Sequence, residues 1–254
     1  MLIAVDIGNS SINIGFFTES GLLVQKIATQ PLISSSEYAS LLNGFIKEKN
    51  IDKTPEGVII SSVVPGHTGV LIETLKELTS VEPLMVSCMI KTGIKFDVPR
   101  PEELGSDRIA NAVAAYELYK GPVAAVDFGT ATTINVVGKD ANYIGGAIMP
   151  GVGLMNKSLA KGTSKLSEVT LKPPEAALGT DTDGCIQSGL FLGTAGATER
   201  LISEIEKEAG SGLKVVVTGG YGGMISRFLR REHDLRPNLT IEGLEIIYMR
   251  NRDA

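Results

Sequence analysis

The chain has 254 residues, 43% of them hydrophobic and 21% charged, so it can bury a substantial core in one large domain or two smaller ones. Its formal net charge is −5, and apolar residues interrupt its densest basic stretch, Arg227–Arg231, which argues against nucleic acid as a partner. Two cysteines are too few for a disulfide framework, and no apolar run approaches the roughly 20 residues of a membrane span. We therefore expect a cytoplasmic protein that does not bind membranes.

The first hundred residues predict a mixed sheet with helices on its faces. In chain order, the expected elements are strands at 2–5, around 12–16 and at 22–27, a helix at 35–48, a strand at 57–64, a helix after residue 67 and a strand near 84–87. Ser34 and Glu37 have the spacing of a capping box, and Pro65 should stop the strand before it. The order β-β-β-α-β-α-β is typical of an α/β fold.

The opening pattern returns after residue 120. Val123–Thr130 repeats the layout of Leu2–Asn9, with Asp127 in the place of Asp6, and strand-like alternation follows both copies. The repeat predicts a duplicated fold with domains 1–119 and 120–254. The other expected elements are an ordered loop at 96–104, a helix at 107–119 capped by Ser106, a helix at 183–209, a strand at 214–217 and a last strand at 244–249.

Two acidic turns, one in each half, are candidate phosphate-binding loops. Asp6-Ile7-Gly8-Asn9-Ser10 ends the first strand, and Asp127-Phe128-Gly129-Thr130 ends its counterpart. Glycine lets the backbone approach a phosphate, N–H and hydroxyl groups donate to it, and the carboxylate would act through a bound Mg²⁺. One such turn is equally compatible with an ordinary hairpin. Two copies favour a pair of loops that hold the phosphates of one nucleotide.

Asp107 and Arg108 open a helix and are candidate catalytic and binding residues. The helix dipole favours an ionised carboxylate in the first turn, and such a carboxylate can accept the proton of a substrate hydroxyl. Arg108 can pair with an acidic substrate group. Asp107 as a simple helix cap is the stronger reading from these residues alone. Thr218-Gly219-Gly220 is equally a platform for a flat base or a strand-to-helix turn.

Taken together, these residues resemble the type III pantothenate kinases, of the acetate and sugar kinase/actin-like superfamily. The resemblance runs over nearly the whole chain and rests on motifs that include Asp6–Ser10, Ser62–Pro65, Gly105–Asn111, Asp127–Thr132, Gly145–Ile148 with Pro150-Gly151, Thr182 before Gln187–Gly189, and Thr218–Gly220. The Asp-x-Gly turns are shared with sugar kinases, actin and chaperone ATPases. The Gly-x-Asp-Arg segment at this distance from Asp-Phe-Gly-Thr-Ala-Thr is more specific.

The resemblance implies a fold and an activity. The fold would be a ribonuclease-H-like (actin-like ATPase) domain duplicated in one α/β subunit, each copy a mixed sheet flanked by helices, with a cleft between them. The subunit would form a homodimer. The activity would be ATP-dependent phosphorylation of the primary hydroxyl of pantothenate to 4'-phosphopantothenate, the first step of coenzyme A biosynthesis.

The resemblance also implies roles for individual residues. Asp107 would accept the proton, Asp127 would bind K⁺ or NH₄⁺, and Asp6 would hold Mg²⁺ through water. ATP would contact Asp6, Ile7, Gly8, Asn9, Ser10, Ser11, Ile12, Asn13 and Thr130. Pantothenate would contact Gly105, Ser106, Asp107, Arg108 and Thr182. A second cation fits the electrostatics, because it offsets the repulsion between a carboxylate and the triphosphate.

The sequence departs from the family pattern at two positions. Ser10 stands where Thr is usual, which keeps the hydroxyl, and Val98 occupies a slot where relatives often place Tyr. The alternative functions are a same-fold nucleotide-binding regulator without kinase activity, and a phosphatase or a kinase of another substrate. The presence of Asp6, Asp107 and Asp127 favours the kinase, because loss of catalysis is expected to alter at least one of them.

Overall fold

The computed structural model describes residues 1–51 and 54–252, and the chain forms two compact units. The first comprises Met1–Lys95, Pro99–Ala114 and the C-terminal segment from Thr240, and the second comprises Phe96–Val98 and Ala115–Leu239. The units therefore do not follow a single cut along the chain. The division into domains 1–119 and 120–254, inferred from the sequence repeat, stays a prediction of where one repeated half ends and the next begins.

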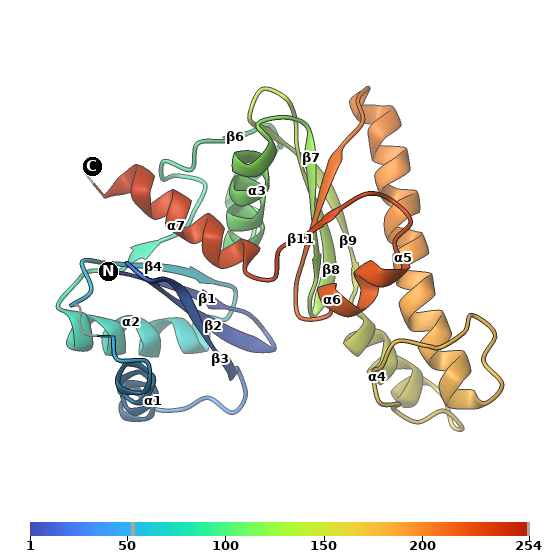
Figure 1. The fold of residues 1–254 in the computed structure, drawn as a ribbon, viewed down its shortest axis with the longest axis horizontal. Helices are drawn as coiled ribbons and strands as arrows, with labels where there is room; N and C mark the ends of the chain where they lie inside the picture. Colours follow the sequence, from blue (N-terminus) through green and yellow to red (C-terminus); the bar gives the residue numbers. More distant parts are fainter. Residues whose placement is uncertain (52–53, 253–254) are drawn as a thin grey trace. The chain divides into compact units, whose positions relative to one another are not determined.

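A five-stranded mixed sheet forms the centre of the first unit, in the order β3-β2-β1-β4-β5 (Figure 1). The central strand β1 pairs antiparallel with β2 and parallel with β4, while β2 pairs antiparallel with β3 and β4 pairs parallel with β5. The strands are β1 (Leu2–Ile7), β2 (Ser11–Thr18), β3 (Gly21–Ala28), β4 (Gly57–Ser62) and β5 (Leu84–Met85). All five predicted strands of this region are present.

One face of the first sheet is apolar, and two helices cover it, α1 (Ser35–Glu48) and α2 (Pro65–Thr79) (Figure 1). Ile3, Val5 and Ile7 of β1 lie on this face, because successive strand residues alternate between faces. They pack in one buried cluster with side chains of both helices. The intervening residues of β1, including Asp6, point to the other face.

Two sequence signals mark the starts of these helices. The capping box is confirmed: the Glu37 N–H donates to the Ser34 hydroxyl, and the Ser34 N–H donates to the Glu37 carboxylate at 2.8 Å. The second helix begins at Pro65 rather than after His67. Proline suits the first helical turn because its missing N–H would have no partner there. The residue that was expected only to stop a strand therefore also starts a helix.

The last predicted strand, Leu244–Met249, is wrong: this segment lies within the helix α7 (Leu239–Asn251). Ile241, Leu244 and Ile247 are buried at a spacing of three residues, which is the period of a helix face. The apolar run that suggested a strand is one buried side of this helix. In the first unit, α7 lies on the side of the sheet opposite α1 and α2 (Figure 1).

Hydrogen bonds attach α7 to its own unit and to α3 (Ser106–Tyr119). The Thr240 hydroxyl donates to Asn111 Oδ1 of α3 at 2.8 Å, and the Tyr248 hydroxyl donates to the Glu56 carbonyl at 3.2 Å. The N-terminal part of α3, up to Ala114, and most of α7 thus belong to the first compact unit.

The second unit repeats the topology of the first. Its sheet has the order β11-β10-β7-β8-β9-β6, and β9-β8-β7-β10-β11 corresponds strand by strand to β3-β2-β1-β4-β5 in order and direction. The strands are β7 (Val123–Phe128), β8 (Ala131–Val137), β9 (Asn142–Pro150), β10 (Lys214–Thr218), β11 (Asp234–Leu235) and the short edge strand β6 (Lys95–Phe96). The predicted duplicated α/β fold is confirmed.

Helices also flank the second sheet. They are α4 (Val152–Gly162), α5 (Thr182–Ala209) and the single turn α6 (Gly222–Ile225), and 3-10 turns occur at Pro101–Glu103 and Ser226–Phe228. The predicted helix at 183–209 begins one residue earlier, whereas α4 was not predicted. Phe128 and Phe191, both fully buried, join the sheet to α5 in one core cluster.

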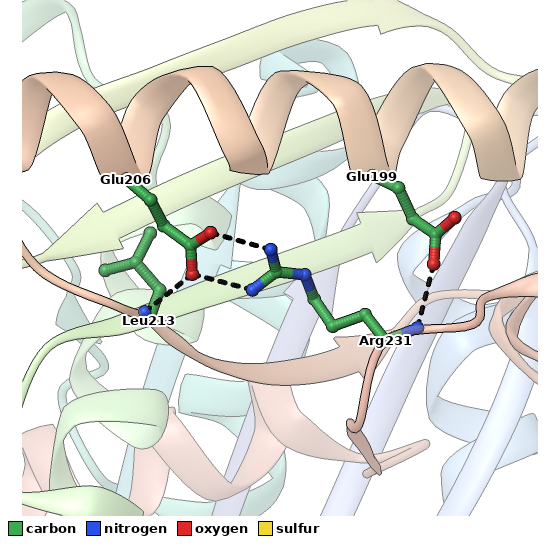
Figure 2. A network of polar contacts seen from close by, with 4 residues as sticks. All are labelled: Glu199, Glu206, Leu213 and Arg231. Carbon is green, nitrogen blue, oxygen red and sulfur yellow. Dashed lines mark hydrogen bonds and ion pairs between the residues drawn. The ribbon is translucent and has the colours of Figure 1, made fainter.

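A bidentate ion pair ties the C-terminal half of α5 to the segment that precedes β11 (Figure 2). The two terminal guanidinium nitrogens of Arg231, Nη1 and Nη2, each donate to the Glu206 carboxylate at 2.7 Å, and the Leu213 N–H donates to the same carboxylate at 2.9 Å. Glu199, two turns earlier on α5, accepts from the Arg231 N–H at 2.8 Å. The hydrogen bond from Arg231 lowers the pKa of Glu206. Burial acts in the opposite direction, and the Leu213 N–H and the positive charge of Arg231 lower the pKa further.

Arg231→Met should lower the free energy of unfolding by about 1–2 kcal/mol at neutral pH, because it removes two charge-assisted hydrogen bonds between side chains that are only 23% and 21% exposed. A lowered carboxylate pKa stabilises the fold above the unfolded pKa, and this contribution is lost as the pH falls through the folded pKa. The difference between wild type and variant should therefore shrink in acid. Urea unfolding at two pH values measures it, with Arg200→Met, which breaks the exposed pair with Glu204, as a control expected to cost less.

Within residues 1–51 and 54–252, no helix combines the length and the apolar character that crossing a bilayer requires.

Candidate functional site

The first acidic turn follows β1. Asp6 lies opposite Asn13 on β2 and opposite Ser61 on the parallel strand β4. The residue is only 9% exposed, and its carboxylate accepts a hydrogen bond from the Ser61 hydroxyl, with 3.1 Å between Oγ and Oδ1. The register of three strands therefore places Asp6 beside a hydroxyl donor inside the first unit.

The turn after Asp6 is held by its own backbone and by Thr29, which follows β3. The Gly8 N–H donates to the Ser11 carbonyl at 3.0 Å. The Thr29 hydroxyl donates to the Gly8 carbonyl at 2.6 Å, and the Thr29 N–H donates to the Ser10 carbonyl at 3.3 Å. Asn9 and Ser10 are exposed at the tip of this turn. The loop is thus formed in advance, with its polar tip accessible.

Two apolar residues of the predicted ATP-binding segment have fully buried side chains. Ile7 and Ile12 are 0% exposed and belong to the core cluster under α1 and α2. Their side chains therefore stabilise the fold, and only their backbone groups remain for a ligand. Asn13, directly opposite Asp6, lies on the other face of the sheet.

The second acidic turn occupies the equivalent place in the second unit. Asp127 lies opposite Thr133 on β8 and opposite Thr218 on the parallel strand β10, as Asp6 lies opposite Asn13 and Ser61. The Gly129 N–H donates across its turn to the Ala131 carbonyl at 3.1 Å. The Thr130 carbonyl accepts from the Gly151 N–H at 3.1 Å, which joins the turn to the end of β9.

The two carboxylates have different neighbours on the parallel strand. Ser61 donates to Asp6, whereas the Thr218 hydroxyl, at the corresponding position, donates to the Pro237 carbonyl at 3.5 Å. The following residue, Gly219, lies against Asp127 instead. A Cβ at Gly219 would be 2.3 Å from Asp127 Oδ1, and its φ of +94° is a conformation that favours glycine. The duplicated turns are therefore alike in backbone and unlike in what surrounds the acid.

Asp107 lies in the first turn of α3, in the first unit. The Arg108 N–H donates to its Oδ1 at 2.8 Å. Burial raises the pKa of Asp107, and the Arg108 N–H and positive charge offset part of this increase. Gly105 lies close to the same carboxylate, since a Cβ there would be 2.5 Å from Oδ1. A carboxylate of raised pKa, anchored through one oxygen, is a suitable proton acceptor.

Ser106 does not precede the helix as a cap, as the sequence analysis expected, but is its first residue. Its hydroxyl oxygen accepts from the Ser62 N–H at 2.9 Å and lies 3.0 Å from the Ser61 hydroxyl oxygen. Ser106 is 8% exposed and therefore connects α3 to β4 within the core. Its hydroxyl contacts these strand residues, and its contact with substrate stays a prediction.

Thr182, also predicted to bind substrate, is the exposed first residue of α5 in the second unit. The preceding Asp181 caps the helix by accepting from the Gly184 N–H at 2.7 Å. Thr182 borders an open cavity of about 650 Å³. The cavity is lined by Leu159, Leu166, Gly179, Thr180, Asp181, Thr182, Cys185, Ile186, Gly189 and Leu190. This lining is mainly apolar and includes the polar residues Thr180, Asp181 and Thr182.

Two residues close to the acids were not singled out from the sequence. Ser61 was part of a predicted strand, and Gly219 was considered for a base platform rather than as a neighbour of Asp127. A signal for Ser61 was present in the repeat, because Ile59-Ile60-Ser61 and Val216-Val217-Thr218 are equivalent buried strand ends. Aligning these strands beside the Asp-x-Gly turns would have placed Ser61 and Thr218 next to the two acids.

The donors near the acids are oxygens, which suit hard cations such as Mg²⁺ and K⁺. Over residues 1–51 and 54–252, no three His, Cys, Asp or Glu side chains come together as a metal-binding group. Mg²⁺ is commonly held by one or two carboxylates together with water and substrate phosphates. A single acid such as Asp6, beside a turn of N–H and hydroxyl donors, fits that mode of binding.

Solved structures with this fold include kinases and nucleotide-binding proteins. A conserved putative Baf family transcriptional activator from Campylobacter jejuni aligns with a TM-score of 0.60 at 19% identity, over 99% of this chain and 100% of that one. A ROK family glucokinase from Streptomyces griseus, solved with glucose and AMPPNP, aligns with a TM-score of 0.55 at 12% identity, over 99% of each chain. At these identities the likeness establishes the fold, which is that of sugar kinases and actin-like ATPases.

Sequence comparison identifies the family. A family model described as type III pantothenate kinase matches residues 2–204. The type III pantothenate kinase of Dehalococcoides mccartyi is 41% identical over 255 residues, covering 99% of this chain and 98% of the relative. That of Roseiflexus sp. is 40% identical over 254 residues, covering 99% of this chain and all of the relative. The chain therefore belongs to the type III pantothenate kinase family.

Proposed function

We propose that this chain transfers the γ-phosphoryl group of ATP to the primary hydroxyl of pantothenate, giving 4'-phosphopantothenate and ADP at the first step of coenzyme A biosynthesis. The observation that supports this most is family membership over nearly the full length, combined with an aspartate of raised pKa at the start of α3. Family membership indicates pantothenate as the substrate, and Asp107 is placed as a group that can accept the proton of its hydroxyl.

Asp107 is the proposed proton acceptor. The pantothenate hydroxyl oxygen forms a bond to the γ-phosphorus while the bond to the bridging oxygen of ADP breaks, and the hydroxyl proton passes to the Asp107 carboxylate. The Arg108 N–H holds one carboxylate oxygen at 2.8 Å, so the other is the natural acceptor. Gly105, Ser106, Arg108 and Thr182 are the proposed contacts of pantothenate, with the Arg108 guanidinium suited to its carboxylate.

The phosphate groups are proposed to bind the segment from Asp6 to Asn13, with Thr130 as a further contact of the nucleotide. The preformed Gly8 turn and the exposed Asn9 and Ser10 support this role. Asp6 would hold Mg²⁺ through water, and Asp127 would bind K⁺ or NH₄⁺. When bound, these cations supply positive charge against the triphosphate. The different surroundings of Asp6 and Asp127 are consistent with two different cations.

We further propose that the protein acts as a homodimer in the cytoplasm with pantothenate as its small-molecule partner. The free thiols of Cys88 and Cys185 fit a reducing compartment. Size-exclusion chromatography with light scattering measures the subunit number directly.

A coupled assay of ADP release tests the function. With ATP, Mg²⁺ and K⁺, we expect turnover with pantothenate but not with glycerol or hexoses, and mass spectrometry should find the phosphorylated product. Omitting K⁺ should lower the rate. Equal ATP turnover with and without pantothenate would contradict the substrate, and nucleotide binding without any transfer would support the regulator.

A further inference from the structure

A buried pair of serine hydroxyls lies between Asp6 and the first turn of α3, which carries Asp107. Ser61 lies at the end of β4, is 0% exposed, and donates to Asp6 Oδ1 at 3.1 Å. Its Oγ is 3.0 Å from Oγ of Ser106, the first residue of α3. Ser106 immediately precedes Asp107, so two hydroxyl groups lie between the Asp6 carboxylate and the helix turn that carries the proton acceptor.

The backbone of β4 holds this pair in place. The Ser62 N–H donates to Ser106 Oγ at 2.9 Å, and the Ser62 carbonyl lies 3.2 Å from the same oxygen. Ser106 is therefore attached to the strand by its side chain in addition to the packing of its helix. The attachment fixes the start of α3 relative to the strand that lies beside Asp6.

The bond to Asp6 decides which groups donate in this pair. Ser61 donates to Asp6 Oδ1, and a hydroxyl has a single hydrogen, so the Ser61 oxygen is left to accept. Ser106 is then the donor to Ser61 or to the Ser62 carbonyl, at 3.0 and 3.2 Å. A donor that itself accepts a hydrogen bond is a better donor, so Ser106 strengthens the bond from Ser61 to Asp6 when it donates to Ser61.

We propose that Ser61 is a positioning residue for phosphoryl transfer. Its buried hydroxyl holds the Asp6 carboxylate in the orientation that serves the Mg²⁺-bound nucleotide, and links that carboxylate to the α3 turn that bears Asp107. The inference rests on the proposed function for the identity of the nucleotide and for the role of Asp6. The corresponding residue of the second unit, Thr218, donates to the Pro237 carbonyl, so this arrangement belongs to the Asp6 side.

The test measures how much Mg²⁺ strengthens the binding of a non-hydrolysable ATP analogue. Calorimetric titrations with and without Mg²⁺ give this gain in affinity for the wild type, Ser61→Ala, Ser61→Cys and Ser61→Thr. We expect Ala to reduce the gain roughly tenfold, because a hydrogen bond to a charged acceptor is lost. Cys, which keeps the volume but donates weakly, should behave like Ala, and Thr, which restores the hydroxyl, should recover most of the gain.

The matched control is Thr74→Val. Thr74 is a second fully buried hydroxyl in the same unit, donating to the Val70 carbonyl at 2.7 Å, and its replacement should lower the melting temperature without changing the gain from Mg²⁺. An unchanged gain in Ser61→Ala and Ser61→Cys, or an equal loss in Thr74→Val, overturns the proposal. A Ser61-dependent gain in a protein that does not phosphorylate pantothenate keeps the positioning role and rejects the proposed function. Normal pantothenate turnover by the wild type, with an unchanged gain from Mg²⁺ in Ser61→Ala and Ser61→Cys, keeps the proposed function and rejects the positioning role.

Discussion

Asp107→Asn is expected to lower kcat for pantothenate phosphorylation by roughly 10²–10⁴-fold while the protein stays folded, because the amide cannot accept the hydroxyl proton. The pKa of Asp107 is raised by burial, so the activity of the wild type should fall, as the pH decreases, at a higher pH than for an ordinary aspartate. Two measurements test Asp107 as the proton acceptor: the pH dependence of kcat for the wild type and the value of kcat for the variant.

Asp107→Asn should also raise the free energy of unfolding at neutral pH. A carboxyl group whose folded pKa is raised contributes stability that is present below its unfolded pKa and is lost as the pH rises through its folded pKa. Asparagine has no charge to bury, so it avoids this loss near neutral pH and gives no advantage in acid. Asp140→Asn, in the exposed turn between β8 and β9, is the control and should change neither property. A destabilised Asp107→Asn with full activity would reject both roles.

Gly219→Ala is expected to remove the stimulation by K⁺ and to lower the free energy of unfolding by roughly 2–4 kcal/mol. A Cβ at this position would lie 2.3 Å from Asp127 Oδ1 and 2.6 Å from backbone atoms of Phe128, and φ is +94°. The Phe128 backbone lies within the sheet, so the Asp127 carboxylate must move away, and the proposed cation ligand is displaced.

Measuring turnover across K⁺ concentrations, together with urea unfolding, separates the two effects of Gly219→Ala. The control is Gly212→Ala, because a Cβ at Gly212 meets no atom within 4 Å and should leave stability nearly unchanged. A full response to K⁺ in Gly219→Ala would contradict the proposed binding of the monovalent cation by the Asp127 carboxylate.

Much of the fold follows from local patterns. The first three strands, the helix at 35–48 and the long helix α5 were predictable because periodicity and capping residues agree over each segment. The final helix was not, because Leu244–Met249 is a short apolar run that fits either period until its packing is known. α4 follows a segment rich in Gly and Pro, which obscured its start.

The acids of the site were visible in the sequence, but their partners were not. Asp6 and Asp127 were found because the motif occurs twice. The bond from Ser61 to Asp6 joins residues 55 positions apart and depends on the register between two parallel strands. The contact of Gly219 with Asp127 depends on β10 lying beside β7. The pattern within one segment does not fix such registers. Only a comparison of the two equivalent strand ends would have pointed to Ser61 and Thr218, and the contact of Gly219 with Asp127 became evident in the folded chain.

The different neighbours of Asp6 and Asp127 point to an advantage of carrying both halves in one gene. In a pair of identical half-length chains, every substitution appears twice, so a serine acquired beside one acid appears beside the other as well. Fusion of the copies removes that constraint. Ser61 and Gly219 could then arise independently, each on its own side. Exchanging the two strand ends, Ser61-Ser62 for Thr218-Gly219, would show how strongly each half depends on its own strand end.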